Sequence, residues 1–206
     1  MKKILRLSVL VALAAAALIG CKKKDNAVLT VGATPEPHAA ILALIVDDLA
    51  KEGVTLKVVE FTDYVTPNDA VESGQIDANF FQHVPYMESF NKEKGYHLVS
   101  VVGTHVEPLA LYSSKYKALA DLPEGATIAI PNDPTNEGRA LLLLQSAKLI
   151  TLDAAAGLTA TPQSVTGNEK KFKFKEIEAA SLPRVLADVD GAIINGNYAL
   201  PAGLTA

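Results

Sequence analysis

Cysteine and tryptophan are almost absent from this sequence, whose 206 residues include one cysteine and no tryptophan. A lone cysteine cannot form an intramolecular disulfide or supply a four-cysteine zinc ribbon, so both of these ways of stabilising a small domain are excluded. Charged residues make up only 20% of the chain and hydrophobic residues 49%, which excludes a disordered, collagen-like or coiled-coil protein. The chain therefore needs a packed core, and its length allows one or two compact domains.

Basic clusters are also missing from the body of the chain. Lys2, Lys3 and Arg6 lie in a segment that we expect to be removed, which lowers the basic count from 19 to 16 against 23 acidic residues. Nucleic-acid phosphates require a basic footprint. A mildly acidic chain with scattered lysines therefore argues against nucleic acid as a partner.

The common enzyme signatures are absent as well. The sequence contains no P-loop, HExxH or GxSxG motif and no Rossmann glycine fingerprint. Its histidines stand at positions 38, 83, 97 and 105, and no two of them are spaced i,i+4 to hold zinc from one helix face. The sequence therefore predicts no catalytic residues, no cofactor and no metal site.

The N-terminus carries the most specific short signal. Residues 1–20 begin with lysines, continue as an apolar stretch over residues 9–19 and end at a small residue, which is the layout of a secretory signal peptide. The apolar stretch is much shorter than the ~20 residues that span a bilayer, which disfavours a permanent transmembrane helix. Leu18-Ile19-Gly20-Cys21 resembles a bacterial lipobox, which implies cleavage before Cys21 and lipidation of its sulfur.

Two alternatives remain open at this end of the chain. Cys21 could instead be a buried structural thiol. Residues 21–26 are predicted to form a tether, whose lysines either keep a linker soluble or favour anionic headgroups. The lipid-anchor hypothesis places the protein in a bacterial cell envelope, facing the periplasm or the exterior.

From Val28 onward, short β-rich runs alternate with helical patterns, which is typical of an α/β fold. Helices are predicted from about Pro37 to Gly53, from Pro85 to Lys94 and from Asp133-Pro134 to near Lys148, from apolar spacing, first-turn prolines and terminal glycines. The predicted strands are residues 28–33, 55–61, 78–81, 98–102, 127–130, 172–177 and 191–194.

Two stretches of the chain echo one another. Residues 70–81 and residues 182–195 each contain a helical pattern, an aspartate and an apolar strand, and each strand then leads into polar residues. The echo suggests two similar α/β lobes with ligand groups at corresponding strand ends, where open α/β sheets bind ligands.

Several unusual strings coincide in this chain: Val31-Gly32-Ala33-Thr34-Pro35, Asp77-Ala78-Asn79-Phe80-Phe81-Gln82-His83, Ile130-Pro131-Asn132-Asp133-Pro134-Thr135-Asn136-Glu137-Gly138-Arg139-Ala140 and Asn195-Gly196-Asn197-Tyr198. Together with the lipobox, they strongly resemble the NlpA/MetQ family of methionine-binding lipoproteins, which serve ABC importers. The resemblance covers essentially all of residues 28–206. It implies a two-lobed periplasmic-binding-protein fold with an amino acid held in the cleft between the lobes.

The resemblance also implies the domain boundaries. Lobe one is expected over residues 27–110, and lobe two with the start of a return crossover over residues 111–206. Family members return to the first lobe through further residues, so we expect this chain to be truncated at its C-terminus and to lack part of lobe one.

The predicted helix that begins at Asp133-Pro134 supplies the first candidate binding residues. Its exposed amides attract anions, and Arg139 lies on the same helix face as Asn136 with a planar fork that can bind a carboxylate. The resemblance implies that both side chains contact the backbone groups of the amino acid. The alternative is that Arg139 pairs with a local acid and Asn136 only caps the helix.

Aromatic residues crowd around the strand that ends at Phe81. Strand alternation sends Phe80 and Phe81 to opposite sides, and the resemblance favours Phe81 as a binding residue, with Tyr64, His83 and Tyr86 nearby. An apolar aromatic slot suits a thioether, although the same density is also typical of an ordinary core, and His83 could simply precede a helix.

Asn195 and Asn197 follow the apolar strand at residues 192–194, where their amides can both donate to a carboxylate and accept from an ammonium. Turn formation around Gly196 is the competing explanation.

These observations predict a membrane-tethered, non-catalytic receptor that closes two lobes over a free amino acid, most simply methionine, and presents it to an ABC importer. The alternative from another class is a surface lipoprotein that acts as an adhesin or interaction module on the same fold. An enzyme is the third possibility, with His83 and Asp77 or Glu88 as acid and base, but nothing in the sequence identifies a nucleophile.

Overall fold

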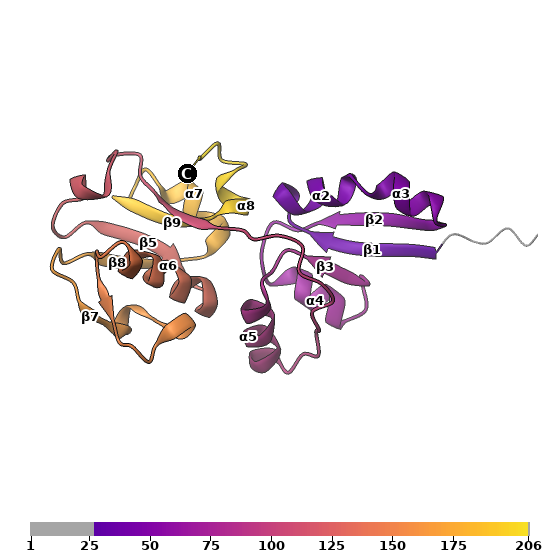
Figure 1. Ribbon diagram of the computed structural model, residues 1–206, viewed down its shortest axis with the longest axis horizontal. Coiled ribbons are helices and arrows are strands. Elements are labelled where there is room, and N and C mark those ends of the chain that lie inside the picture. Colours follow the sequence, from indigo (N-terminus) through magenta and orange to yellow (C-terminus); the bar gives the residue numbers. More distant parts are fainter. Residues whose placement is uncertain (1–26, 206) are drawn as a thin grey trace, which may run out of the picture.

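The computed structural model describes residues 27–205. These residues form two α/β lobes that lie side by side, joined by an extended crossing segment, residues 96–108 (Figure 1). The lobes contain separate sheets, and the carboxyl ends of the parallel strands in the two sheets face each other across the boundary between the lobes (Figure 1).

The first lobe is built on a parallel sheet with the strand order β2-β1-β3. The helix predicted from Pro37 to Gly53 is interrupted by a turn at Leu44 and Ile45, both of which are exposed. The elements of this lobe are β1 (Ala27–Ala33), η1 (Pro35–Ala39), α2 (Ala40–Ala43), α3 (Val46–Lys51), β2 (Val54–Glu60), α4 (Thr66–Glu72), β3 (Ala78–Phe80) and α5 (Val84–Lys94).

The second lobe is built on a mixed sheet with the order β4-β9-β5-β8, in which β4 alone is antiparallel to its neighbour. Ile128, Ile130 and Ile193 of the sheet pack with Leu141 and Leu144 of helix α6 in the main core. The elements are β4 (Leu109–Tyr112), η2 (Leu119–Asp121), β5 (Thr127–Pro131), α6 (Pro134–Ser146), β6 (Thr151–Leu152), η3 (Gly157–Thr159), η4 (Pro162–Ser164), β7 (Val165–Gly167), β8 (Lys173–Ile177), η5 (Ala179–Ser181), α7 (Leu182–Val185), β9 (Gly191–Asn195) and α8 (Gly196–Ala199).

The sequence echo between the lobes corresponds to a repeated hydrogen-bond arrangement. In the first lobe, Asp77 accepts from the backbone N–H of Thr30 through Oδ2 at 2.7 Å and donates its own N–H to the Thr30 carbonyl at 2.9 Å. In the second lobe, Asp190 makes the same pair of bonds with Thr127, at 2.8 Å and 3.0 Å. Each aspartate thus ties the start of β3 or β9 to its parallel neighbour, β1 or β5.

The crossing segment corrects one sequence prediction. Residues 98–102 were expected to form a strand, but they have no strand conformation. Val99, Val101 and Val102 are 78%, 89% and 72% exposed, so their apolar character does not reflect burial among the described residues. A missed strand, β4, follows directly after this segment and pairs with β9.

Candidate binding site between the lobes

The start of helix α6 forms one wall of the candidate site. Asp133 precedes the helix and accepts from the backbone N–H of Asn136 at 3.0 Å, while its two carboxylate oxygens also accept from the Asn136 amide at 2.9 Å and 3.0 Å. Asn136 is thereby fixed with its Oδ1 directed away from the cap. That oxygen accepts from Arg139 Nη1 at 2.8 Å, as the shared helix face predicts.

Arg139 is held by neutral groups. Its second terminal nitrogen, Nη2, donates to the backbone carbonyl of Glu107 at 2.9 Å, and burial lowers the pKa of Arg139 although Glu107 and Asp133 oppose this effect. Within residues 27–205, no carboxylate lies within 4.0 Å of the guanidinium. The expected alternative, a local Arg–acid pair, is therefore not formed by these residues.

The end of β9 supplies two further amides. Asn195 Nδ2 donates to Asn136 Oδ1 at 3.0 Å, and its own Oδ1 is buried without a hydrogen-bond partner among the described residues. Asn197, in α8, accepts from the Tyr64 hydroxyl at 2.5 Å, and its Nδ2 is likewise buried and unbonded. The site thus contains an unused acceptor and an unused donor within a short stretch of chain.

The first lobe contributes the aromatic side of the site. The Tyr64 ring lies 5.7 Å from that of Phe81 and 5.9 Å from that of Tyr86, and the Tyr86 hydroxyl donates to the Tyr64 carbonyl at 2.9 Å. Burial raises the pKa of Tyr64 and of Tyr86, which keeps both hydroxyls protonated. As alternation predicts, Phe80 lies on the other side, against His38.

His83 links the aromatic side to the polar wall. Burial, with a smaller contribution from the charge of Arg139, lowers the pKa of His83 to about 4, so the imidazole is neutral at pH 7. Its Nε2 is buried and unbonded within the described part of the chain. It immediately precedes helix α5, as the sequence alternative proposed, but that position also places it near Arg139.

The predicted residues therefore come together from both lobes. The Tyr64–Asn197 hydrogen bond joins the aromatic side to α8, and Asn195, at the end of the preceding strand β9, bonds to Asn136, which in turn bonds to Arg139. This connected group will be called the interlobe site: Tyr64, Phe81, His83, Tyr86, Asn136, Arg139, Asn195 and Asn197.

Comparison with known proteins assigns the family. The family model described as "NlpA lipoprotein" matches residues 29–206. The chain belongs to the NlpA lipoprotein family. The sequence-based identification is thus confirmed, together with the two-lobed periplasmic-binding-protein fold that it implies.

Individual relatives of this NlpA-family chain agree over most of their lengths. It is 49% identical to "Membrane lipoprotein TpN32" of Treponema pallidum, covering 92% of this chain and 70% of that relative. It is 45% identical to "D-methionine-binding lipoprotein MetQ" of Escherichia coli K12, covering 92% and 72%. A nutrient-binding protein from Burkholderia cenocepacia, solved bound to methionine, superposes with a TM-score of 0.81 at 50% identity, covering 85% of this chain and 75% of that one.

Sequence reasoning missed other groups at the interlobe site of this NlpA-family protein. Glu107 comes from the crossing segment, and burial raises the pKa of its carboxyl to about 7, although the backbone N–H of Asn197 and the charge of Arg139 oppose the increase. Tyr198 stacks on Tyr64 at 4.9 Å and donates to the Thr62 carbonyl at 3.1 Å. Glu107 has no pattern around it that would reveal it, whereas Tyr198 lies in one of the strings that carried the resemblance.

The predicted signal peptide, lipidated Cys21 and tether lie outside the described residues. Among residues 27–205, no helix has both the length and the apolar character required to cross a membrane. Relatives of this NlpA-family chain are named membrane or outer membrane lipoproteins.

Proposed function

We propose that this protein is a lipid-anchored receptor that binds free methionine between its lobes and delivers it to an ABC importer. The observation that carries the proposal is Arg139, a half-buried guanidinium that no carboxylate of the described residues neutralises. A buried charge without a counterion is costly, and an anionic ligand group removes that cost.

The proposed ligand arrangement follows from the remaining groups. The ligand carboxylate binds Arg139, and the Asn195 Oδ1, which no described residue uses, accepts from the ligand ammonium. The apolar side chain lies between the rings of Tyr64, Phe81 and Tyr86, where a thioether sulfur gains ~0.3 to 1.5 kcal/mol at a ring edge beyond simple burial.

Neutrality of the aromatic side favours methionine over charged amino acids. His83 is uncharged at pH 7, and both tyrosine hydroxyls remain protonated, so none of these groups can neutralise a charged ligand side chain. The names of the E. coli and B. cenocepacia relatives support the same ligand and leave the adhesin alternative without support.

Two measurements test the proposal. Native mass spectrometry of freshly purified protein should detect methionine that remains bound through purification. Calorimetry after ligand removal should show tighter binding of methionine than of glutamate or lysine. Tighter binding of either charged amino acid would contradict the neutral aromatic slot.

Delivery to an importer needs its own experiment. Proteoliposomes that contain a methionine ABC importer should take up labelled methionine faster when this protein is added with its ligand. Arg139→Ala, added at the same concentration, should give less stimulation because it carries less ligand. Equal uptake with and without the protein would contradict the importer assignment.

A further inference from the structure

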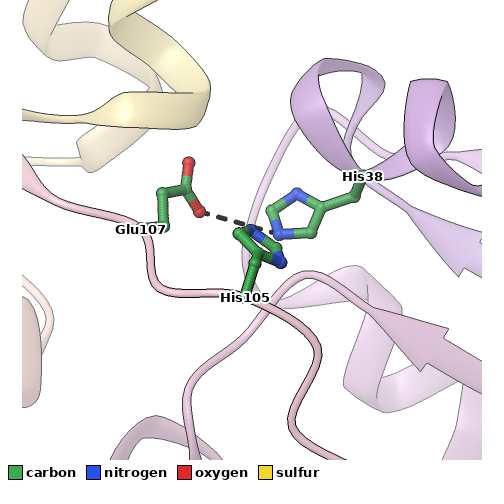
Figure 2. A group of neighbouring side chains, drawn as sticks. All are labelled: His38, His105 and Glu107. Carbon is green, nitrogen blue, oxygen red and sulfur yellow. Dashed lines mark ion pairs between the residues drawn. The ribbon is translucent and has the colours of Figure 1, made fainter.

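A second group of side chains converges beside the interlobe site. It lies on the Phe80 side of β3, opposite the aromatic side formed by Tyr64, Phe81 and Tyr86. His38 comes from η1 in the first lobe, whereas His105 and Glu107 come from the crossing segment (Figure 2). One ligand-type atom from each residue lies within 4.8 Å of the others. His38 is far from the other two residues in the sequence, so a search for histidines spaced i,i+4 could not detect the cluster.

The orientation of His38 is fixed by a hydrogen bond at its Nδ1, the ring nitrogen that faces away from Glu107. Its Nδ1 lies 2.6 Å from the Thr34 hydroxyl, so the ring presents Nε2 to Glu107, whose Oε2 is 3.6 Å away (Figure 2). A hydrogen bond from the far ring nitrogen is the usual means by which a protein orients a metal-binding histidine. The edge of the His38 ring also packs against Phe80 at 4.7 Å, which restricts its movement.

His38 and Glu107 do not satisfy each other as they stand. A separation of 3.6 Å is too long for a good hydrogen bond, and Glu107 Oε1 is buried with no partner in the described part of the chain. His38 is only 2% exposed, and its ring packs against Phe80 and His105, so it has little freedom to turn away from Glu107. An imidazole nitrogen and a carboxyl group directed at each other are suited to a cation between them.

We propose that His38, His105 and Glu107 bind a divalent transition-metal ion, such as Zn²⁺, through His38 Nε2, His105 and the Glu107 carboxylate, with solvent at a fourth position. Two imidazoles and one carboxylate form the ligand set of many zinc sites that keep one open position. Imidazole-rich sites favour zinc, copper or nickel, whereas magnesium and calcium prefer sites made only of oxygen ligands.

The movement required to form the site is small. Zn–N and Zn–O bonds of ~2.0 to 2.2 Å place neighbouring ligand atoms ~3.3 to 3.5 Å apart in a tetrahedral site. The His38–Glu107 distance is already 3.6 Å, and no ligand atom is more than 4.8 Å from the others. His105 is exposed on a segment without secondary structure, so it can make most of the adjustment.

The position of the ion suggests a mechanical consequence. The ion would connect the crossing segment, through His105 and Glu107, to His38 in η1. The backbone carbonyl of Glu107 also accepts a hydrogen bond from Arg139 Nη2. Gly196 faces the same carboxylate, and a Cβ at that position would lie 3.2 Å from Glu107 Oε1. The metal site would therefore brace the wall of the interlobe site that holds Arg139.

Cobalt binding provides a direct test. Full-length protein is treated with a chelator, dialysed and titrated with Co²⁺, and zinc affinity is then measured by competition. We expect one Co²⁺ per chain with the intense visible bands of four-coordinate cobalt, displacement by Zn²⁺, and no displacement by Mg²⁺ or Ca²⁺. Absence of the visible bands, or displacement by Mg²⁺, would overturn the proposal.

Variants locate the ion. His105→Ala should weaken Zn²⁺ binding by ~100-fold or more, and Thr34→Val, which only releases the far nitrogen of His38, by ~10- to 100-fold. The matched control is His97→Ala, because His97 also pairs with a glutamate, Glu72, at 3.0 Å but lies outside the cluster. If His97→Ala weakens binding as much as His105→Ala does, the ion binds elsewhere and the proposal fails.

The amino-acid function is separated from the metal site by one further measurement. His105→Ala should bind methionine as the parent does when both are measured in chelator. Loss of Zn²⁺ binding with intact methionine binding supports the metal site on its own, whereas intact Zn²⁺ binding without methionine binding contradicts only the proposed receptor function.

Discussion

Arg139 is surrounded by neutral oxygen atoms. Asn136 Oδ1 and the Glu107 carbonyl each accept one of its N–H groups, but neither carries the charge that a buried guanidinium requires. The N–H groups of the fork that these acceptors do not use are available to a planar anion. Burial is the main reason why the pKa of the neighbouring His83 is lowered and its imidazole is neutral, and repulsion by the Arg139 charge adds to this effect.

Arg139→Ala should weaken methionine binding by ~30-fold to several-thousand-fold, because truncating one partner of a buried charge pair costs ~2 to 5 kcal/mol. Arg139→Lys keeps the charge but loses the fork, so we expect intermediate affinity. Titration calorimetry with methionine and its carboxamide measures both effects. If folded Arg139→Ala binds within about threefold of the parent, a loss of less than ~1 kcal/mol, the carboxylate is bound elsewhere.

Glu137 should make the protein less stable as the pH rises. Burial, followed by the neighbouring carboxyl of Glu176, raises the pKa of Glu137 to about 7 in the folded state. The folded state therefore retains a proton that the unfolded state loses above its ordinary pKa of 4.5, and this contribution to stability disappears as the pH rises through about 7. Glu137→Gln resembles the protonated carboxyl at every pH, so it should abolish this loss of stability at high pH.

Urea unfolding at an acidic pH below 4.5, where the unfolded state also keeps the proton, and at a mildly alkaline pH measures this effect. Glu137→Gln should match the parent at the acidic pH and exceed it by ~1 to 2 kcal/mol at the alkaline pH, after allowance for solvent screening of a partly exposed pair. Glu124→Gln, in an exposed pair with Lys171, is the control and should differ by less than ~1 kcal/mol at both pH values. An equal effect of the two substitutions would contradict the assignment.

The positions of the interlobe-site residues were predictable where a local pattern or a motif marked them. The spacing of Asn136 and Arg139 places them on one helix face, and alternation separates Phe80 from Phe81, as the structure has them. Glu107 and His105 were not predictable in this way, because the crossing segment has no periodicity and its contacts depend on where it passes between the lobes.

Helix α6 requires a glycine at a position where helices usually gain from alanine. A Cβ on Gly138 would lie 2.1 Å from the Leu158 carbonyl oxygen in η3, and a backbone atom cannot rotate away. The close approach of η3 to α6 therefore depends on the missing side chain, and it fixes the helix that carries Asn136 and Arg139.

Gly138→Ala should lower the free energy of unfolding by ~1 to 3 kcal/mol or more, since overpacking outweighs the usual helix gain of just under ~1 kcal/mol. It should also weaken methionine binding if η3 displaces the start of α6. The control is Gly103→Ala, where a Cβ meets nothing within 4 Å. Chemical denaturation of both variants provides the measurement, and equal stability would show that η3 adjusts freely.

Most elements were predictable because each has a local signature. The first-turn proline and terminal glycine of α5 locate it to within about one residue, and the apolar run of β5 is buried as expected. The prediction of a strand at residues 98–102 was wrong, because β-branched composition does not show whether a neighbouring strand is present to pair with the segment. The helix predicted at residues 37–53 was longer than any helix observed there, because a turn at Leu44 and Ile45 interrupts the helical pattern.

At the scale of the whole molecule, the interlobe site is assembled from segments far apart in the chain. Tyr64 bonds to Asn197, and Tyr198 bonds to the Thr62 carbonyl, so both lobes contribute to one site. Asp77 and Asp190 make the same pair of bonds at the starts of β3 and β9, and the carboxyl ends of the parallel strands of both sheets lie at the boundary between the lobes. Only the echo and the family strings indicated such a pairing in the sequence.

Membrane attachment is the part of our proposal that concerns residues outside the two lobes. Our hypothesis assigns attachment to a lipid on Cys21, after Leu18-Ile19-Gly20. One acyl chain gives only marginal binding, whereas two chains of a diacylglycerol anchor stably, so Cys21→Ala should move the protein from the membrane to the soluble fraction. The same variant should bind methionine like the parent, which distinguishes a lost anchor from a lost fold. Mass spectrometry of the mature N-terminus completes the test: an unmodified Cys21 or an intact Met1 in the membrane fraction would contradict the lipid anchor, even if methionine binding is confirmed.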